Sequence, residues 1–118
     1  MYRLYNPQLD LARCIVSLCS AEIDLGMAQH EHAQAEAILL HLVDEMQQLD
    51  VLLTALHQLG RTNSFQYQCL AFEHNVKEHE AIIALDAVSA TQYQIGHLQL
   101  AIGRLKIEIE DIEAILRL

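Results

Sequence analysis

Residues 11–56 read LARCIVSLCS AEIDLGMAQH EHAQAEAILL HLVDEMQQLD VLLTAL. Steps of three and four residues alternate through this stretch without a break, and every position they reach except His32 is small or apolar. An α-helix turns once in 3.6 residues, so these positions form one continuous stripe, the seam of a coiled coil. Its members are Leu11, Cys14, Leu18, Ala21, Leu25, Ala28, His32, Ala35, Leu39, Leu42, Met46, Leu49, Leu53 and Leu56.

A second seam with the same rhythm ends the chain. Between the two seams, Gly60–Ser64 reads as a turn, because Gly60 suits the left-handed position that closes a helix. Asn63 is expected to cap the next helix, with Gln66 completing a capping box, and Asn6 is expected to cap the first helix before Pro7. The late seam consists of Ile95, Leu98, Ile102, Leu105, Ile109, Ile112 and Leu116.

These signals predict an all-α fold, an antiparallel two-helix coiled-coil hairpin within a single helical domain spanning 1–118. The helices are expected at 7–59 and 65–117, around a turn at 60–64. Gly26 and Ser89 are weak helix positions, so a break at each into a four-helix bundle is an alternative. The apolar share of 53% exceeds what a lone hairpin hides, which also leaves completion by oligomerisation open.

The turn centre suggests a register in which facing residue numbers add up to about 124. In the early half of the second helix the apolar residues shift phase, and Lys77 falls on the extrapolated seam. The register predicts that small residues meet along the half near the termini and that charged residues meet across the hairpin. The expected pairs are Ala21 with Gly103, Ala28 with Gly96, Ala35 with Ser89, Arg13 with Asp111, and Glu45 with His79.

Composition excludes several classes of function. The net charge of -9 disfavours nucleic acid and anionic membrane surfaces, which require clustered Lys and Arg. No run of about 18 apolar residues predicts a membrane span, and the first residues lack a signal-peptide core. The three cysteines fit no zinc spacing, and no nucleophile or phosphate-binding motif occurs. We therefore expect a cytoplasmic protein that is not an enzyme and has no cofactor.

A further apolar stripe lies opposite the late seam and predicts a partner-binding face. Tyr93, Leu100, Ile107 and Ala114 recur every seven residues on the far side of the helix. A helix that is apolar on two faces is expected to be covered on both, by a partner helix or by a second copy. Glu110 and Asp111 add negative charge that would attract a basic partner surface. The alternative is a compact bundle that buries the stripe internally.

The histidines support a second hypothesis, a metal-binding helical bundle. His41 and Glu45 are four residues apart and share a helix face, a spacing that can hold iron, manganese or zinc. His74 and Glu78 share the same four-residue spacing. The H-x-x-x-E element of His41 and Glu45 is similar to that of hemerythrin-like proteins, and the resemblance implies that His74 and His79 supply further ligands. The residue pattern leaves open the alternative of solvated side-chain pairs on a helix surface.

The hairpin also resembles the stalk proteins of flagellar and type III secretion ATPases. The resemblance rests on Gln34-Ala-Glu36 in the first helix, on Tyr67-x-x-Leu70 after the turn, and on the aromatic-rich stretch 65–72. In that family the hairpin sits at the centre of a hexameric ATPase and contacts the export gate. The resemblance implies a non-enzymatic protein–protein interaction module, as a secretion-apparatus stalk or an export chaperone or adaptor, with helical protein partners.

Overall fold

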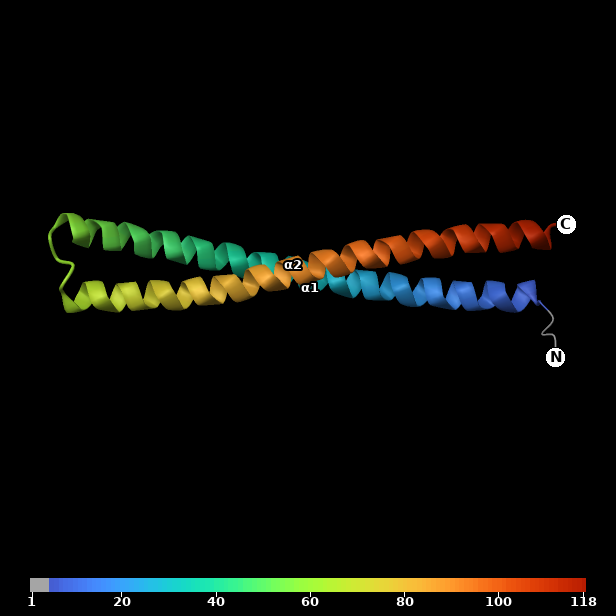
Figure 1. Ribbon diagram of the computed structural model, residues 1–118, viewed down its shortest axis with the longest axis horizontal. Helices are drawn as coiled ribbons and strands as arrows, with labels where there is room; N and C mark the ends of the chain where they lie inside the picture. The colour runs from blue at the N-terminus through green and yellow to red at the C-terminus, as the bar shows by residue number, and fades with distance from the viewer. Residues whose placement is uncertain (1–4) are drawn as a thin grey trace. The chain divides into compact units, whose positions relative to one another are not determined.

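The computed structural model describes residues 5–118 and contains two α-helices joined by a short turn (Figure 1). Helix α1 is Pro7–Gln58 and helix α2 is Phe65–Leu116. The helices pack against each other as a hairpin, and the described residues form no strand. The predicted all-α hairpin is confirmed, and its helices end within one residue of the predicted 7–59 and 65–117.

Both helices are continuous, so the alternative of a four-helix bundle is wrong. Gly26 lies inside α1 and Ser89 lies inside α2, and neither interrupts its helix. A helical glycine costs roughly 1 kcal/mol relative to alanine. Burial of the neighbouring seam side chains offsets that cost, since Leu25 is half-buried and Ala28 is 1% exposed.

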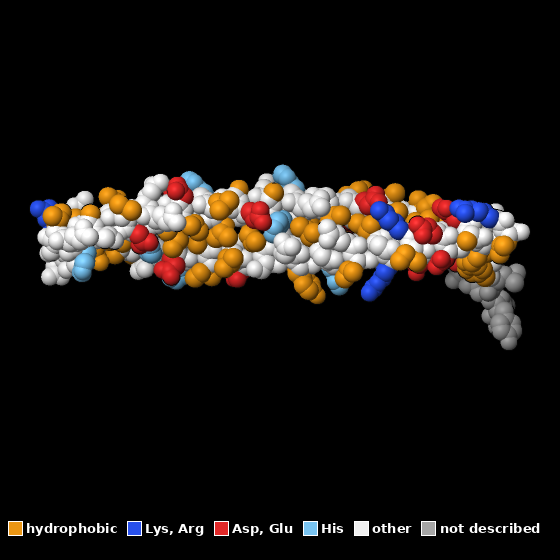
Figure 2. All heavy atoms as spheres, turned by 90° about the horizontal axis from the view of Figure 1, so that it is seen from above, with side chains coloured by type: hydrophobic (Ala, Val, Ile, Leu, Met, Phe, Trp, Pro, Cys, Tyr) orange, Lys and Arg blue, Asp and Glu red, His pale blue; other side chains and the backbone are white. Residues whose placement is uncertain are grey.

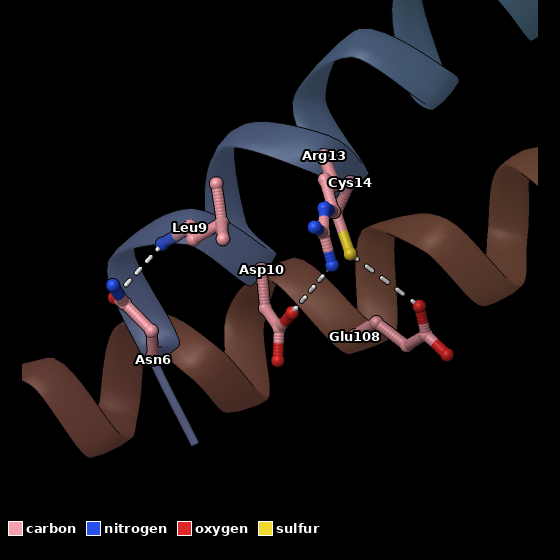
Figure 3. A network of polar contacts seen from close by, with 6 residues as sticks. All are labelled: Asn6, Leu9, Asp10, Arg13, Cys14 and Glu108. Carbon is pink, nitrogen blue, oxygen red and sulfur yellow. Dashed lines mark hydrogen bonds and ion pairs between the residues drawn. The ribbon is translucent and has the colours of Figure 1, made fainter. Parts of the chain in front are cut away.

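The helix ends follow local capping rules, with one correction. The Asn6 side chain accepts a hydrogen bond from the Leu9 amide (3.1 Å), as predicted for an N-cap (Figure 3). At the other end of α1, Gly60 has φ of 72°, the expected left-handed closing position. Ser64, and not Asn63, caps α2, because its hydroxyl both accepts from the Tyr67 amide (3.1 Å) and donates to the Arg61 carbonyl (2.8 Å).

The tertiary contacts divide the chain into two compact units. Unit 1 joins the part of α1 up to His30 with Thr91–Leu118, and unit 2 is Glu31–Ala90. Each unit is therefore an antiparallel pair of helix segments with its own share of the seam. The prediction of one domain spanning 1–118 stays a prediction.

The α1 seam predicted from the sequence is the buried face of that helix. All fourteen predicted positions are buried or half-buried, while nearly all other α1 positions are exposed. The most buried members are Ala28 in unit 1 and Ala35, Leu42, Leu49 and Leu56 in unit 2. A strict three-four stripe is narrow, which explains why so many apolar residues remain outside it.

The α2 seam is regular from Tyr67 to Ile112, which corrects the expected phase shift, whereas Leu116 at the end of the helix is 40% exposed. In unit 2 it passes through His74, Lys77 and Ala84, and these residues are at least half-buried. The apolar residues that suggested a change of phase, such as Phe72 and Ile83, are exposed. Burial thus follows the geometry set by the long α1 seam, even where α2 supplies a polar side chain.

Side-chain contacts between α1 and α2 agree with the predicted register but change the facing residues. Cys14 contacts Glu108 in unit 1, and Glu45 contacts Lys77 in unit 2. The residue numbers in both pairs add up to 122, close to the expected value. In the structure Glu45 therefore pairs with Lys77 and not with His79.

The predicted meeting of small residues is also wrong. Gly96, Gly103 and Ser89 are exposed, because each lies one residue past a buried or half-buried seam position of α2. The residues that precede them in sequence, Val88, Ile95 and Ile102, are large and β-branched, and they occupy the buried or half-buried seam positions.

Candidate docking surface

The predicted partner-binding stripe lies on the surface of unit 1. Tyr93, Leu100 and Ile107 are 75%, 63% and 60% exposed, and Ala114 is also exposed. Ile102, which is two residues after Leu100 and lies on the seam face, is only 8% exposed. Figure 2 shows hydrophobic side chains open to solvent along the face it presents. Unit 1 itself does not cover the stripe, so this face of α2 is available to another molecule.

The stripe is half of a second three-four pattern that the sequence reasoning missed. Steps of four and three residues from Ser89 reach Tyr93, Gly96, Leu100, Gly103 and Ile107. We call these six residues the outer seam of α2. Large and small residues alternate strictly along it, and all six are exposed. The alternation of three- and four-residue steps that predicted the inner seams also identifies the outer seam when it is started at Tyr93.

Helix α1 carries a matching surface in unit 1. Ala12, Val16, Cys19, Ile23 and Gly26 follow the same three-four rhythm and are all exposed. We call this set the outer seam of α1; like that of α2 it alternates small and large residues. The sequence did not predict a role for this set, because its apolar residues were considered only as part of the 53% apolar share of the whole chain.

The acidic end of α2 is partly engaged within unit 1. Glu110 and Asp111 are exposed, as a docking role for basic partners requires. Arg13 pairs with Asp10 of its own helix at 3.9 Å and not with Asp111 (Figure 3). Cys14 donates its thiol proton to Glu108 at 3.5 Å. Burial and then this carboxylate raise the pKa of the Cys14 thiol, which disfavours the thiolate.

The candidate metal ligands are engaged in pairwise contacts. Glu45 contacts both His41 and Lys77, and its carboxylate lies 2.6 Å from the Lys77 ammonium. The hydrogen bond from Lys77 lowers the pKa of Glu45, and the same bond raises the pKa of Lys77. A cation already occupies this carboxylate, so a metal ion would have to displace Lys77 to bind there.

The remaining candidates lie apart from that pair. His74 Nε2 is 3.0 Å from an Asp50 oxygen, close enough for an ion pair although outside hydrogen-bonding geometry. The His79 ring lies 2.8 Å from the Asn75 carbonyl, and Glu78 is exposed. Within residues 5–118, no three His, Cys, Asp or Glu side chains come together as a metal site would require.

The described helices lack any segment long and apolar enough to cross a membrane. Comparisons with known proteins find no matching family model, no similar curated protein and no similar solved structure. The resemblance to secretion ATPase stalks therefore remains an expectation. The exposed outer seams are the feature of the surface that most needs a functional explanation, since exposed apolar stripes of this regularity mark association sites.

Proposed function

We propose that the protein is a non-enzymatic interaction module that docks an α-helix on the outer seam of α2. The observation that carries the proposal is the exposure of Leu100 and Ile107, in a three-four rhythm, on a helix already packed on its other side. An amphipathic helix that presents apolar residues at the same spacing is the matching partner for such a face.

The free energies of burial and of association indicate how much surface the partner helix must cover. Covering the exposed part of one large side chain yields roughly 1–2 kcal/mol, so Tyr93, Leu100 and Ile107 together yield about 3–6 kcal/mol. Association costs an estimated 4–15 kcal/mol in lost rotational and translational freedom. Over most of these ranges the three side chains alone leave no net affinity, so tight binding requires that the partner helix also contribute its own large residues over the small positions.

The specific version of this proposal is a cytoplasmic secretion-apparatus stalk, or an export chaperone or adaptor. The hairpin architecture and the acidic end of α2, with Glu110 and Asp111 exposed, support it. In this arrangement the inner seams hold the hairpin together and the outer face meets the partner. The acidic end then steers a basic partner surface towards the helix.

The test compares protein retention from extracts of the source cells by tagged wild-type protein and by a Leu100→Glu/Ile107→Glu variant. The matched control, Ile82→Glu/Ile83→Glu, makes the same change at exposed residues of α2 in unit 2. Circular dichroism checks that all three proteins remain helical. The proposal requires a specific partner lost only with the outer-seam variant, and equal retention by all three proteins refutes it. Co-elution with a secretion ATPase tests the specific version.

A further inference from the structure

The glycines inside the two helices have no explanation within the subunit. Glycine weakens a helix relative to alanine, so it is retained where a side chain would obstruct something. A Cβ added at Gly26, Gly96 or Gly103 would meet nothing within 4 Å. Gly96 and Gly103 lie between exposed large residues of the outer seam of α2, and Gly26 is the last residue of the outer seam of α1. Close approach of another helix is the physical reason that would favour glycine there.

The charge distribution indicates which molecule can approach. Unit 2 holds nine acidic and two basic residues, whereas unit 1 holds seven acidic and five basic residues. Within α2, residues 87–107 contain no Asp or Glu, while Arg104 and Lys106 are present. Two copies of this acidic chain can therefore meet along that stretch without carboxylate repulsion.

We propose that the outer seam of α2 packs antiparallel against the same seam of a second copy, around a two-fold axis. The proposal rests on the docking surface described above and names its occupant. A two-fold interface is self-complementary and closed, which suits a seam that alternates large and small residues.

One register satisfies every position of the outer seam. It seats Tyr93 on Gly103 of the partner subunit and Leu100 on Gly96 of the partner subunit. Ile107 then meets Ser89 of the partner subunit, and the two-fold axis repeats all three contacts. A shift by one heptad in one direction would place Tyr93 against Glu110 of the partner subunit, and a shift in the other direction would place Gly103 against Asp86 of the partner subunit. The residues that flank the outer seam include Gln92, Gln99, Arg104 and Lys106, and none of the flanking residues is an Asp or Glu.

The first experiment measures the mass of the purified full chain by light scattering over a range of concentrations. A dimer of the 13.4 kDa chain is expected, and a Gly96→Leu/Gly103→Leu variant is expected to be monomeric. The leucine substitutions add apolar surface and helix propensity, so they would strengthen a nonspecific association. Loss of the dimer would therefore indicate a specific interface. Gly26→Leu, the same change on the outer seam of α1, is the matched control and should remain dimeric.

Three results would overturn the proposal: a wild-type monomer at every concentration, a dimer that survives the double substitution, or equal loss of the dimer in the Gly26→Leu control. A second measurement covers the case in which the double variant does not fold. Gly96→Cys and Leu100→Cys proteins, each also carrying Cys19→Ser and Cys69→Ser, are mixed and oxidised. Preferential disulfide formation between the two variants is expected, and preferential homodimeric disulfides contradict the register.

These outcomes separate the dimer from the proposed function. The scattering and disulfide measurements use the purified chain alone, whereas the retention experiment detects foreign protein. A monomer that still retains a partner through Leu100 and Ile107 refutes the dimer and leaves the docking function intact. A dimer of the predicted register that retains no other protein supports self-association and removes the adaptor role.

Discussion

Replacing Gly26 in α1 and Gly60 in the turn by alanine should change the free energy of unfolding in opposite directions. Gly26 is helical and a Cβ there meets nothing within 4 Å, so Gly26→Ala should stabilise the protein by about 1 kcal/mol. Gly60 also has open space, but its φ of 72° is disfavoured for any residue with a side chain. Gly60→Ala should therefore destabilise by roughly 1–2 kcal/mol.

Urea unfolding followed by circular dichroism measures both effects, at one fixed protein concentration because association would add to the apparent stability. For a chain of this length, 1 kcal/mol corresponds to roughly 3–6 °C in Tm. The two variants control each other, since the chemical change is the same and only the backbone conformation differs. If Gly26→Ala destabilised the protein, the argument that helix propensity alone decides that position would be refuted. A neutral Gly60→Ala would refute the role of the left-handed turn.

The remaining predictions concern the seam, the cap and the outer face. Leu42→Ala should cost about 2–3 kcal/mol in urea unfolding, the lower part of the usual range, because solvent can reach the sides of a two-helix seam. Ser64→Ala should cost about 1 kcal/mol by losing the α2 cap, and an unchanged midpoint would contradict the capping role. Since Lys77 lowers the pKa of Glu45, the pair stabilises the fold above the ordinary glutamate pKa of about 4.3 and loses this contribution as pH falls through the lower folded value. A Glu45→Gln variant should therefore differ from wild type at pH 6 and converge with it in acid, as urea midpoints against pH would show. Leu100→Glu should leave the stability of the isolated subunit within about 0.5 kcal/mol, because that side chain is exposed.

The sequence alone located the outer apolar stripe but not its small-residue half. Tyr93, Leu100 and Ile107 are conspicuous because large apolar residues recur at a seven-residue spacing. The expected register instead placed Gly96 and Gly103 opposite alanines of α1, because small residues were expected to mark the closest approach of the helices. The structure keeps the predicted seam through Ile95 and Ile102 and shows that the two glycines lie beside it, exposed.

The α1 seam, the Gly60 turn and the Asn6 cap were determined by sequence, because each depends on periodicity or on backbone preferences of a few neighbouring residues. The path of the seam through the early half of α2 was decided by tertiary structure. There, the long α1 seam sets which face is buried, and it brings His74 and Lys77 inward while Phe72 remains outside. The pairing of Glu45 with Lys77 also results from the inward position of Lys77. A side chain's place across a hairpin depends on the phase of both helices, which neither helix specifies by itself.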